Sequence, residues 1–344
     1  FNTFIAMFLI ISEIYLFLFR THVKLGNRHK LSVGTEYIVD VLKSQTDNIA
    51  KEDAYTLALF AQDEIKLLRN LQALIGVRYI YHENFKNHAT PNVALMYKPG
   101  KFNFRASYAA GFRTPTLSEL YATDIAKKND RLTIGNLDLK PEKNNYFSLS
   151  AEYVHERFSV SVNAFYNNIR DMIDYNTIAT GDKAMEQYGH KEVRQRDNIA
   201  EAKVHGINVS ANAYLGAGFN LSGGYTHLNT QDVELEQPID KSIKNAYNIN
   251  AQWAHSWKIY RLNINLNGRI NSKRFSKSYG YAPEYQLWDL NTRHSFNLKS
   301  VIIEPGFGME NLFDYMDDRP YNSNYATLTP GRSFYISLSL KFKS

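Results

Sequence analysis

The feature that most constrains the fold of this chain is an alternation of apolar and polar residues with a period of two. The segment 158–166 reads FSVSVNAFY, and the pattern returns at 206–215, 260–268 and 334–342. Because successive side chains of a β-strand point to opposite faces, this period predicts sheets with one apolar and one polar face. We therefore expect an all-β chain.

The expected strands are longer than those of most soluble proteins. Each has roughly 10–15 residues, whereas globular strands typically have about 5 or 6. A strand of about 9–11 residues crosses a bilayer at a tilt, so this length suits a membrane-spanning sheet. The expected strands, about fourteen in number on the alternation criterion, lie at 30–43, 54–68, 70–83, 89–98, 101–112, 144–155, 157–171, 201–215, 218–230, 244–256, 258–271, 284–297, 300–313 and 331–342.

The connections between these strands alternate in length. The short ones are Arg69-Asn70, Lys98-Pro99-Gly100, Glu156, Gly216-Ala217, Ser256-Trp257 and Lys299. The long ones are 44–53, 113–143, 172–200, 231–243, 272–283 and 314–330. A soluble sandwich has no physical reason to sort its loops in this way, whereas membrane barrels have short periplasmic turns and long extracellular loops. The sequence therefore predicts a transmembrane antiparallel β-barrel.

The composition agrees with a barrel and excludes several other classes of protein. The 344 residues include 24 Tyr, 20 Phe and 3 Trp, yet the mean hydropathy is only −0.41. A helical membrane protein would need repeated apolar runs of about 20 residues, whereas barrel strands mix lipid-facing aromatic residues with polar ones. The lack of cysteine excludes disulfides, thiolate metal sites and a cysteine nucleophile.

The charge pattern and the motif content argue against nucleic-acid binding and against catalysis. Lys and Arg number 40 against 34 Asp and Glu, which gives a net charge of +6, and the basic residues are spread without a basic helix or arm. The chain contains no Gly-rich phosphate loop and no HExxH or GxSxG motif. We therefore expect no nucleic-acid partner, no resident cofactor or metal, and no enzymatic activity.

Six stretches of the chain resemble the barrel of TonB-dependent outer-membrane receptors. They are ALFAQDE at 58–64, YAAGFRTP at 108–115 followed by Leu117 and Leu120-Tyr121, GN at 135–136 leading to LKPE at 139–142, YNNIRDMI at 166–173, NLFD at 311–314, and PGR at 330–332 with the final strand. Each stretch is weak by itself, but together they follow the order and spacing of the family over about residues 30–344.

The resemblance implies a more detailed fold and role. The family's barrel has 22 strands around a plug, so we expect about 14 of those strands here, as the C-terminal part of the barrel over residues 26–344, with the plug absent. It implies an outer-membrane receptor of Gram-negative bacteria for energised, TonB-dependent uptake of a ferric siderophore or similar iron chelate. A haem or cobalamin receptor of the same family and a passive 14-strand porin-like channel are the alternatives.

The resemblance also implies partners for the receptor. They are outer-membrane lipid, the barrel-assembly machinery, the ferric chelate itself, and the TonB energy-coupling protein, which would act through an N-terminal part that we expect to lie outside this chain.

Residues 1–25 differ from the rest of the chain. The first twenty read FNTFIAMFLIISEIYLFLFR, which is almost wholly apolar and does not alternate. A signal peptide would need a positive n-region and a small-residue cleavage site, and a transmembrane helix would carry Glu13 inside its apolar run. We therefore favour an irregular apolar segment, either a distorted barrel strand or the result of a truncated start, ahead of a helix or a signal peptide.

Ligand-binding residues are expected in the outer loops, because the loops of a rigid scaffold usually carry recognition. An anionic iron chelate would be bound by cations and by aromatic rings. The candidates are Arg113, Tyr121, Lys127, Lys128 and Arg131 in the loop 113–143, and Arg274, Tyr279 and Tyr281 in the loop 272–283.

A haem ligand would require a His or Tyr side chain at the iron. The candidates are His82, His88, Tyr188 and His190. Haem receptors of the resembling family typically carry a His between the two boxes at 112–115 and 135–142, and this chain has none there. The acidic run Asp232, Glu234, Glu236 and Asp240 lacks the residue order of a calcium loop, so we interpret it as a solvated loop.

Overall fold

The computed structural model describes residues 10–44, 49–126, 130–276, 280–317 and 329–343. These residues form nineteen strands and two short helices. The long strands are β1 (Ile10–Leu25), β2 (His29–Ser44), β3 (Ile49–Leu68), β4 (Leu71–His82), β5 (Lys86–Tyr97), β6 (Phe102–Arg113), β9 (Glu142–Val154), β10 (Phe158–Thr180), β11 (Glu192–Gly216), β12 (Phe219–Asp232), β13 (Asn245–Trp257), β14 (Tyr260–Asn271), β17 (Tyr285–Asn297), β18 (Val301–Glu310) and β19 (Ser333–Phe342). The short elements are α1 (Leu117–Tyr121), β7 (Asp124–Ala126), β8 (Arg131–Ile134), α2 (Gly181–Tyr188), β15 (Arg274–Ser276) and β16 (Gly280–Ala282).

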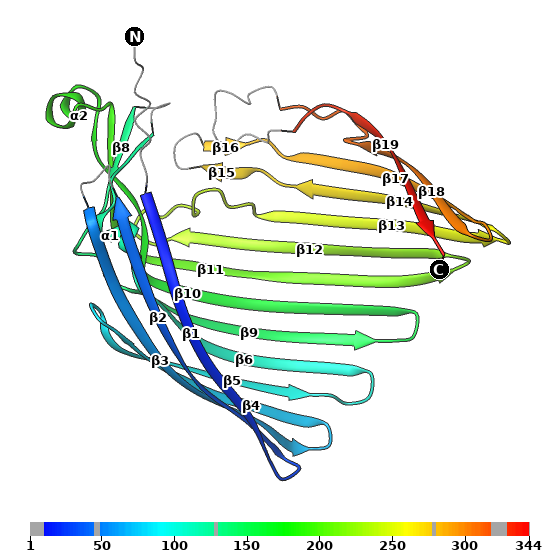
Figure 1. The fold of residues 1–344 in the computed structure, drawn as a ribbon, viewed down its shortest axis with the longest axis horizontal. Helices are drawn as coiled ribbons and strands as arrows, with labels where there is room; N and C mark the ends of the chain where they lie inside the picture. Colours follow the sequence, from blue (N-terminus) through cyan, green and yellow to red (C-terminus); the bar gives the residue numbers. More distant parts are fainter. Residues whose placement is uncertain (1–9, 45–48, 127–129, 277–279, 318–328, 344) are drawn as a thin grey trace.

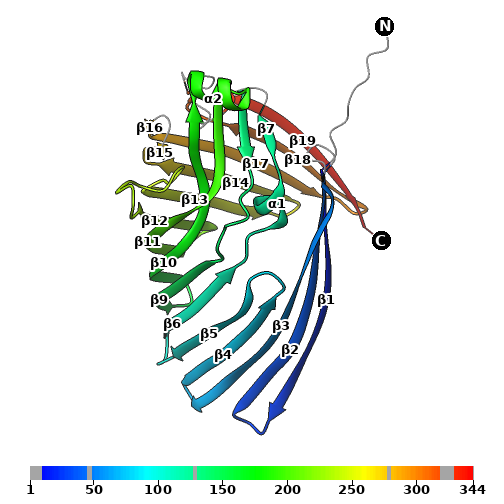
Figure 2. The ribbon, with the colours of Figure 1, turned by 90° about the vertical axis from the view of Figure 1, so that its left-hand side faces the viewer.

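The long strands pair in the order in which they follow along the chain, each antiparallel to the next. The ladder runs from β1 to β6, passes from β6 directly to β9, continues to β14, and then passes to β17, β18 and β19. The sheet curves strongly, so that one of its faces is concave and carries α1 (Figure 2). We call this concave side the inner face of the sheet.

The connections are sorted between the two ends of the strands, as the sequence predicts. Short turns such as 69–70, 98–101 and 155–157 lie at one end, whereas α1, α2 and the short strands lie at the other (Figure 1). We call these the short-turn end and the long-loop end. All fourteen expected strands are present, so the antiparallel, barrel-type, all-β fold is confirmed.

The strand β1 corrects the interpretation of the N-terminal apolar segment as irregular. From Ile10 to Leu25 it is a regular strand that pairs with β2 without any register shift. Residues 1–9 lie outside the described part of the chain. The period of two is hidden because both faces of β1 are apolar from Ile14 to Phe19. Its outer face carries Tyr15, Phe17 and Phe19, and its inner face carries Ile14, Leu16 and Leu18.

The segment 172–200, expected as a loop, is mostly a continuation of two strands. β10 extends to Thr180 and β11 begins at Glu192, and α2 caps the hairpin between them. The expectation was wrong because it relied on alternation. A strand that projects beyond the bilayer has water on both faces, so its sequence need not alternate.

The two faces of the sheet differ in chemistry. On the outer face, Phe147 and Leu149 are 49% and 63% exposed, and they border a shallow hollow whose lining is almost wholly apolar. On the inner face, small and amide residues follow one another across the strands, as Asn250 bonds Asn265 and Asn267 at 2.7 and 2.6 Å. This is the arrangement of a wall between lipid and a polar lumen. Within the described residues, no helix has the length and hydropathy needed to cross a bilayer.

Buried apolar side chains are few, and those that form clusters lie toward the long-loop end. The first cluster joins Leu42, Ala54 and Leu117; the second joins Leu120, Leu139 and Ile173; the third joins Ala179, Ala184 and Val193. The first two contain residues of the connection between β6 and β9. This connection therefore has a packed core of its own.

Candidate ligand-binding site at the long-loop end

The connection between β6 and β9, which we call the inner loop (residues 114–141), folds onto the inner face of the sheet. Its helix α1 lies on the concave side (Figure 2) and contacts both β2 and β3. Leu117 packs against Leu42 and Ala54, while Leu120 packs with Ile173 of β10. Strands that are far apart in the ladder are thus connected through this one loop, which lies across the long-loop end of the inner face.

Local sequence explains why a helix of one turn is stable here. Thr116 is the N-cap, and its hydroxyl accepts a hydrogen bond from the backbone N–H of Glu119 at 3.2 Å. The Glu119 carboxylate accepts in return from the backbone N–H of Thr116 at 2.9 Å. Such a capping box satisfies N–H groups that an isolated helical turn would leave without partners.

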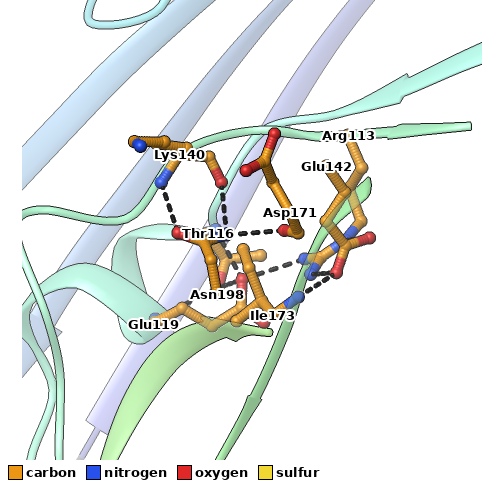
Figure 3. A network of polar contacts seen from close by, with 8 residues as sticks. All are labelled: Arg113, Thr116, Glu119, Lys140, Glu142, Asp171, Ile173 and Asn198. Atoms are coloured by element: carbon orange, nitrogen blue, oxygen red, sulfur yellow. Dashed lines mark hydrogen bonds and ion pairs between the residues drawn. The ribbon is translucent and has the colours of Figure 1, made fainter. Parts of the chain in front are cut away.

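A fork of ion pairs closes the base of the inner loop. Arg113, the last residue of β6, lies opposite Glu142, the first residue of β9. Its Nε and Nη2 donate to the two carboxylate oxygens of Glu142 at 2.8 and 2.6 Å, and its Nη1 donates to Glu119 at 2.9 Å (Figure 3). Glu142 also accepts the backbone N–H of Ile173 at 2.7 Å. We call Arg113, Thr116, Glu119 and Glu142 the neck cluster.

The charges of the neck cluster stabilise one another. Burial by itself would raise the pKa of Glu119, but the hydrogen bonds from Arg113 and Thr116 outweigh burial and hold that pKa below its ordinary value of 4.5. The hydrogen bonds of Glu142 and Glu119 raise the pKa of the Arg113 guanidinium. Each charge of the cluster therefore has a partner. Bidentate pairs of this kind fix orientation as well as contributing energy.

Two asparagines hold the rest of the inner loop against β11. Asn198 donates to the backbone oxygens of Lys140 and Asp171 and accepts from the N–H of Lys140 at 2.8 Å (Figure 3). Asn136 donates to the backbone oxygen of Arg196 at 3.0 Å. Gly135 precedes it where no side chain would fit, because a Cβ there would lie 2.5 Å from the backbone oxygen of Leu120.

The outer part of the inner loop is joined to the projecting hairpin of β10 and β11. β8 pairs in parallel with the start of β11, and Asp130 contacts His190 at 2.9 Å. On the inner side of the same hairpin, the guanidinium of Arg196 lies 3.9 Å from the ring centre of Tyr175. The inner loop and this hairpin therefore form one connected surface above the concave face.

Two of the expected ligand residues have structural roles. The guanidinium of Arg113 is engaged by two carboxylates in the neck cluster. Tyr121 packs against both the first and the second apolar cluster. Both side chains therefore have partners within the protein.

The two histidines of the β4–β5 hairpin also have partners within the protein. His82 is 3% exposed, and its Nδ1 accepts the backbone N–H groups of Asn84 and Phe85 at 3.1 and 3.4 Å. Burial lowers the pKa of His82. His88 lies within hydrogen-bond distance of the backbone oxygen of Phe85 and stacks on Phe112 with ring centres 3.7 Å apart. Both side chains therefore stabilise the turn.

The remaining candidates are divided among three long connections. Tyr188 packs against the third cluster, and Arg131 begins β8. Arg274 and Tyr281 lie on the small hairpin of β15 and β16, where Tyr281 is 56% exposed and meets Phe275 edge to face. Lys127, Lys128 and Tyr279 lie outside the described residues. Among the described residues, no group of three His, Asp or Glu side chains is arranged to hold a metal ion.

A second loop base lies between β18 and β19. The buried Asn311 donates to the backbone oxygens of Tyr315 and Pro330 at 2.7 and 3.0 Å, and Asp314 accepts the backbone N–H of Arg332 at 2.7 Å. These residues belong to the NLFD and PGR stretches. The two motifs are thus parts of one structure, and they tie together the ends of the loop that separates them.

Sequence reasoning missed the residues that hold the inner loop in place. Glu119, Asn136, Glu142 and Asn198 were not among the expected site residues. The spacing of Thr116 and Glu119 is a capping-box signal that could have identified α1. Asn198 offered no such signal, because its partner Lys140 is 58 residues away in sequence.

These features define a class of protein: a membrane-type antiparallel barrel sheet with short turns at one end and anchored loops over its inner face at the other. The chain belongs to the TonB dependent receptor-like β-barrel family, whose family model matches residues 11–312. This confirms the resemblance drawn from the sequence.

Solved structures of this fold cover almost all of the chain. The ferric enterobactin receptor PfeA of Pseudomonas aeruginosa matches 97% of this chain and 54% of its own, with a TM-score of 0.77 and 18% identity. The siderophore receptor PirA of the same organism matches 98% and 58%, with a TM-score of 0.76 and 18% identity. The copper transporter OprC matches 96% and 57%, with a TM-score of 0.74 and 11% identity. The chain therefore spans little more than half the length of these proteins.

Proposed function

We propose that this chain forms most of the barrel wall and the outer loops of an outer-membrane receptor for energised, TonB-dependent uptake of a ferric siderophore or similar iron chelate. The observation that carries the proposal is the inner loop, which is anchored at its neck and joined to the β10–β11 hairpin over the inner face. A surface held in this way is preorganised, which reduces the entropy lost when a ligand binds.

The side chains on this surface suit an anionic, partly aromatic ligand. Arg196 and Tyr175 form a cation–π pair on the inner side of the hairpin, and Tyr281 is exposed on the β15–β16 hairpin. Cations attract an anionic chelate over a distance, and aromatic rings stack on its flat groups. We assign the first contacts with the chelate to Arg196, Tyr175 and Tyr281, with Lys127, Lys128 and Tyr279 as further candidates from sequence.

The proposal includes the partners of such a receptor. Outer-membrane lipid would cover the apolar outer face, and the barrel-assembly machinery would act on the final strand, β19. The energy-coupling protein TonB would act through parts of the receptor beyond this chain. The short-turn end would face the periplasm and the long-loop end the cell exterior.

The test is iron uptake by the full-length receptor in a Gram-negative host that lacks its own siderophore receptors. Uptake of radiolabelled iron should depend on the siderophore supplied and should stop when a protonophore collapses the proton gradient. Uptake that continues after collapse would contradict energised transport and would support a passive channel instead.

A variant separates binding from folding in the same assay. Arg196→Ala should weaken binding of an anionic ferric chelate by about tenfold, because one charged contact is worth roughly 1.5 kcal/mol. Arg261→Ala, on the inner face at the short-turn end, is the matched control and should leave binding unchanged. Equal effects of the two substitutions would contradict the assignment of Arg196.

A further inference from the structure

The outer face of the sheet carries positive charge at one place, on three neighbouring strands toward the long-loop end. The strand register assigns one Lys or Arg to the outer face of each of β9, β10 and β11, within one or two outward positions of the same level. We call these three residues the outward cations: Lys143, Arg170 and Lys203. Within the described residues, the outward positions of β5, β6, β12, β13 and β14 carry no Lys, Arg, Asp or Glu.

The outward cations lie just beyond the apolar band of the outer face. Tyr108, Phe147 and Tyr166 lie opposite one another across β6, β9 and β10 and form a row of aromatic side chains. The hydroxyl of Tyr108 donates to Asn145 at 2.8 Å, so its polar end points toward the long-loop end. The outward cations follow at about 7–13 Å along the strands from this row. Since aromatic rows mark the boundary between hydrocarbon and headgroups, the cations lie at the level of the headgroups.

The outer face at this place is complete within the chain. β9, β10 and β11 each pair with a neighbouring strand on both sides. Further strands would join the ladder at its edges, β1 and β19, and a plug would lie on the inner side. Neither would cover the outward cations, which therefore face the membrane.

Positive charge dominates this part of the outer face. The register places Lys143 directly opposite Arg170, and like charges in such a position repel each other. On the other side of Arg170 lies Glu201, whose carboxylate pairs with Lys203 at 3.7 Å. Three cations thus share one neighbouring carboxylate, and an anion bound between them would relieve the repulsion.

Other outward carboxylates of these strands lie too far away to balance the charge. Asp174 and Asp197 are opposite each other on the projecting part of β10 and β11. They follow four residues beyond Arg170 and Glu201, or roughly 13 Å along the strands. This distance exceeds the Debye length of about 8 Å at physiological ionic strength, so their effect on the outward cations is screened.

An apolar hollow of about 610 Å³ adjoins the outward cations on the side of the short-turn end. It spans β5, β6, β9 and β10, and the aromatic row forms part of its lining. Ala106 and Ala164 lie on either side of Leu149 in the register, and their small side chains leave room beside it. Its volume is within the range of small-molecule sites, about 300–1,000 Å³. A hydrocarbon chain placed there would cover apolar surface directly below the cations.

We propose that the outward cations and this hollow form a binding site for a phosphorylated lipid of the outer leaflet. Lys and Arg bind its phosphate through charge-assisted hydrogen bonds, and an acyl chain occupies the hollow. The assignment to the outer leaflet rests on the proposed function, which places the long-loop end at the cell exterior. The bound lipid would support the base of the β10–β11 hairpin, which carries Arg196 and Tyr175.

Binding of bis-phosphorylated lipid A to the full-length receptor in detergent micelles, measured by native mass spectrometry, tests the proposal. The Lys143→Gln/Arg170→Gln double variant should bind at least about tenfold more weakly, because two charged contacts to phosphate are lost. The charge-preserving Lys143→Arg/Arg170→Lys variant should retain most of the affinity.

The matched control removes two exposed lysines from other places, Lys43 of β2 and Lys258 of a short turn. The Lys43→Gln/Lys258→Gln variant has the same net charge as the first double variant and should bind the lipid as the unaltered receptor does. Equal losses in the two double variants, or unchanged binding in both, would overturn the site. Heat-dependent gel migration confirms that each variant is folded.

A further variant tests the hollow. Ala164→Leu fills the space beside Leu149 and should weaken binding of lipid A, whereas binding of pyrophosphate should be the same as in the unaltered receptor. Pyrophosphate bound as tightly as lipid A would show a site for a free anion and overturn the role of the hollow. Dephosphorylated lipid A bound as tightly as the bis-phosphorylated form would overturn the role of the cations.

Two further measurements separate this proposal from its alternatives. A receptor dimer in sedimentation that the Lys143→Gln/Arg170→Gln variant abolishes would overturn the lipid in favour of a second copy of the protein. Siderophore-dependent uptake without specific lipid binding by the unaltered receptor would overturn the lipid site alone. Specific lipid binding without any siderophore-dependent uptake would overturn the proposed receptor function alone.

Discussion

The neck cluster lies at one end of the inner face, and a group of five cations lies at the other, short-turn end. We call these five the cationic pocket: Lys24, Arg28, Lys30, Lys66 and Arg105. The two groups differ in how their charges are balanced. In the neck cluster, Arg113 is shared between two carboxylates, and Glu142 accepts a backbone N–H as well. In the cationic pocket, four of the five cations have no carboxylate partner among the described residues. The charges of the neck cluster are balanced by partners within the described residues, whereas most of the cations at the short-turn end are not.

The comparison teaches that the type of residue does not reveal its role in this barrel. Arg113 and Arg105 lie on the same strand, eight positions apart, and both face inward. What differs is the strand or loop that faces each of them. A charge whose partner is supplied by the fold stabilises the fold, whereas neighbouring like charges without such partners repel one another.

The largest expected effect comes from removing the shared carboxylate of the neck cluster. Glu142→Ala leaves Arg113 with one partner and the N–H of Ile173 with none. Because Arg113 is partly exposed, we expect a local loss of about 2–3 kcal/mol, or on the order of 100-fold faster hydrogen exchange in the inner loop. Hydrogen–deuterium exchange of the refolded chain measures this.

Glu284→Ala, an exposed carboxylate at the same end of the sheet, is the control for that experiment. It should leave exchange in the inner loop unchanged. Exchange that is the same in Glu142→Ala as in the unaltered chain would show that the apolar clusters alone hold the loop, and the contrast with the cationic pocket would fail.

The next largest effect tests the uncharged hydrogen bonds that hold the inner loop in place. Asn198→Ala removes three hydrogen bonds to the backbone of the inner loop and of β10. We expect roughly tenfold faster exchange around Lys140, since the exposed backbone groups regain water as a partner. An effect larger than that of Glu142→Ala would show that amides, and not the ion pairs, dominate the anchor.

The third prediction concerns acid. The pKa of Glu119 in the folded chain lies below its ordinary value of 4.5, so its contribution to stability is fully present above pH 4.5 and is lost as the pH falls through the lower, folded value. Limited proteolysis of the inner loop should therefore be faster at a pH below the folded pKa of Glu119 than at neutral pH. In Glu119→Gln the acceleration should be smaller, and an identical pH profile in the two chains would contradict the assignment.

The smallest expected effect is a gain in stability, whereas the preceding substitutions lower it. Lys66→Gln removes a cation from a group of like charges, so it should stabilise the chain slightly, within about 0.5 kcal/mol, and only at low salt. Thermal unfolding in detergent at low and high salt measures it. A clear destabilisation would mean that Lys66 has a structural partner, and the pocket would then resemble the neck cluster.

The strand pattern was predictable because the bilayer imposes it locally. Each strand such as β10 must place apolar residues on one face, so its position can be read without knowledge of its neighbours. β1 was expected only as a distorted strand or a truncated start, since both of its faces are apolar from Ile14 to Phe19. The projecting ends of β10 and β11 were missed because no lipid acts on them.

The roles of the site residues were less predictable because the residues that they contact are distant in sequence. Arg113 was expected to bind a ligand, but its carboxylate partner is 29 residues away and meets it only after β6 pairs with β9. For Lys30 and Arg105 the alternation gives the face of the strand correctly. Their gathering in one cavity depends on the register of five ladders, which no local pattern encodes.

The pairing of Arg113 with Glu142 has an evolutionary consequence. The two residues end one strand and begin the next, so the ladder is closed below the loop before the loop begins. Insertions, deletions and exchanges between residues 122 and 135 would leave this closure unchanged. The barrel wall can thus stay the same while natural variation replaces the loop segment above it.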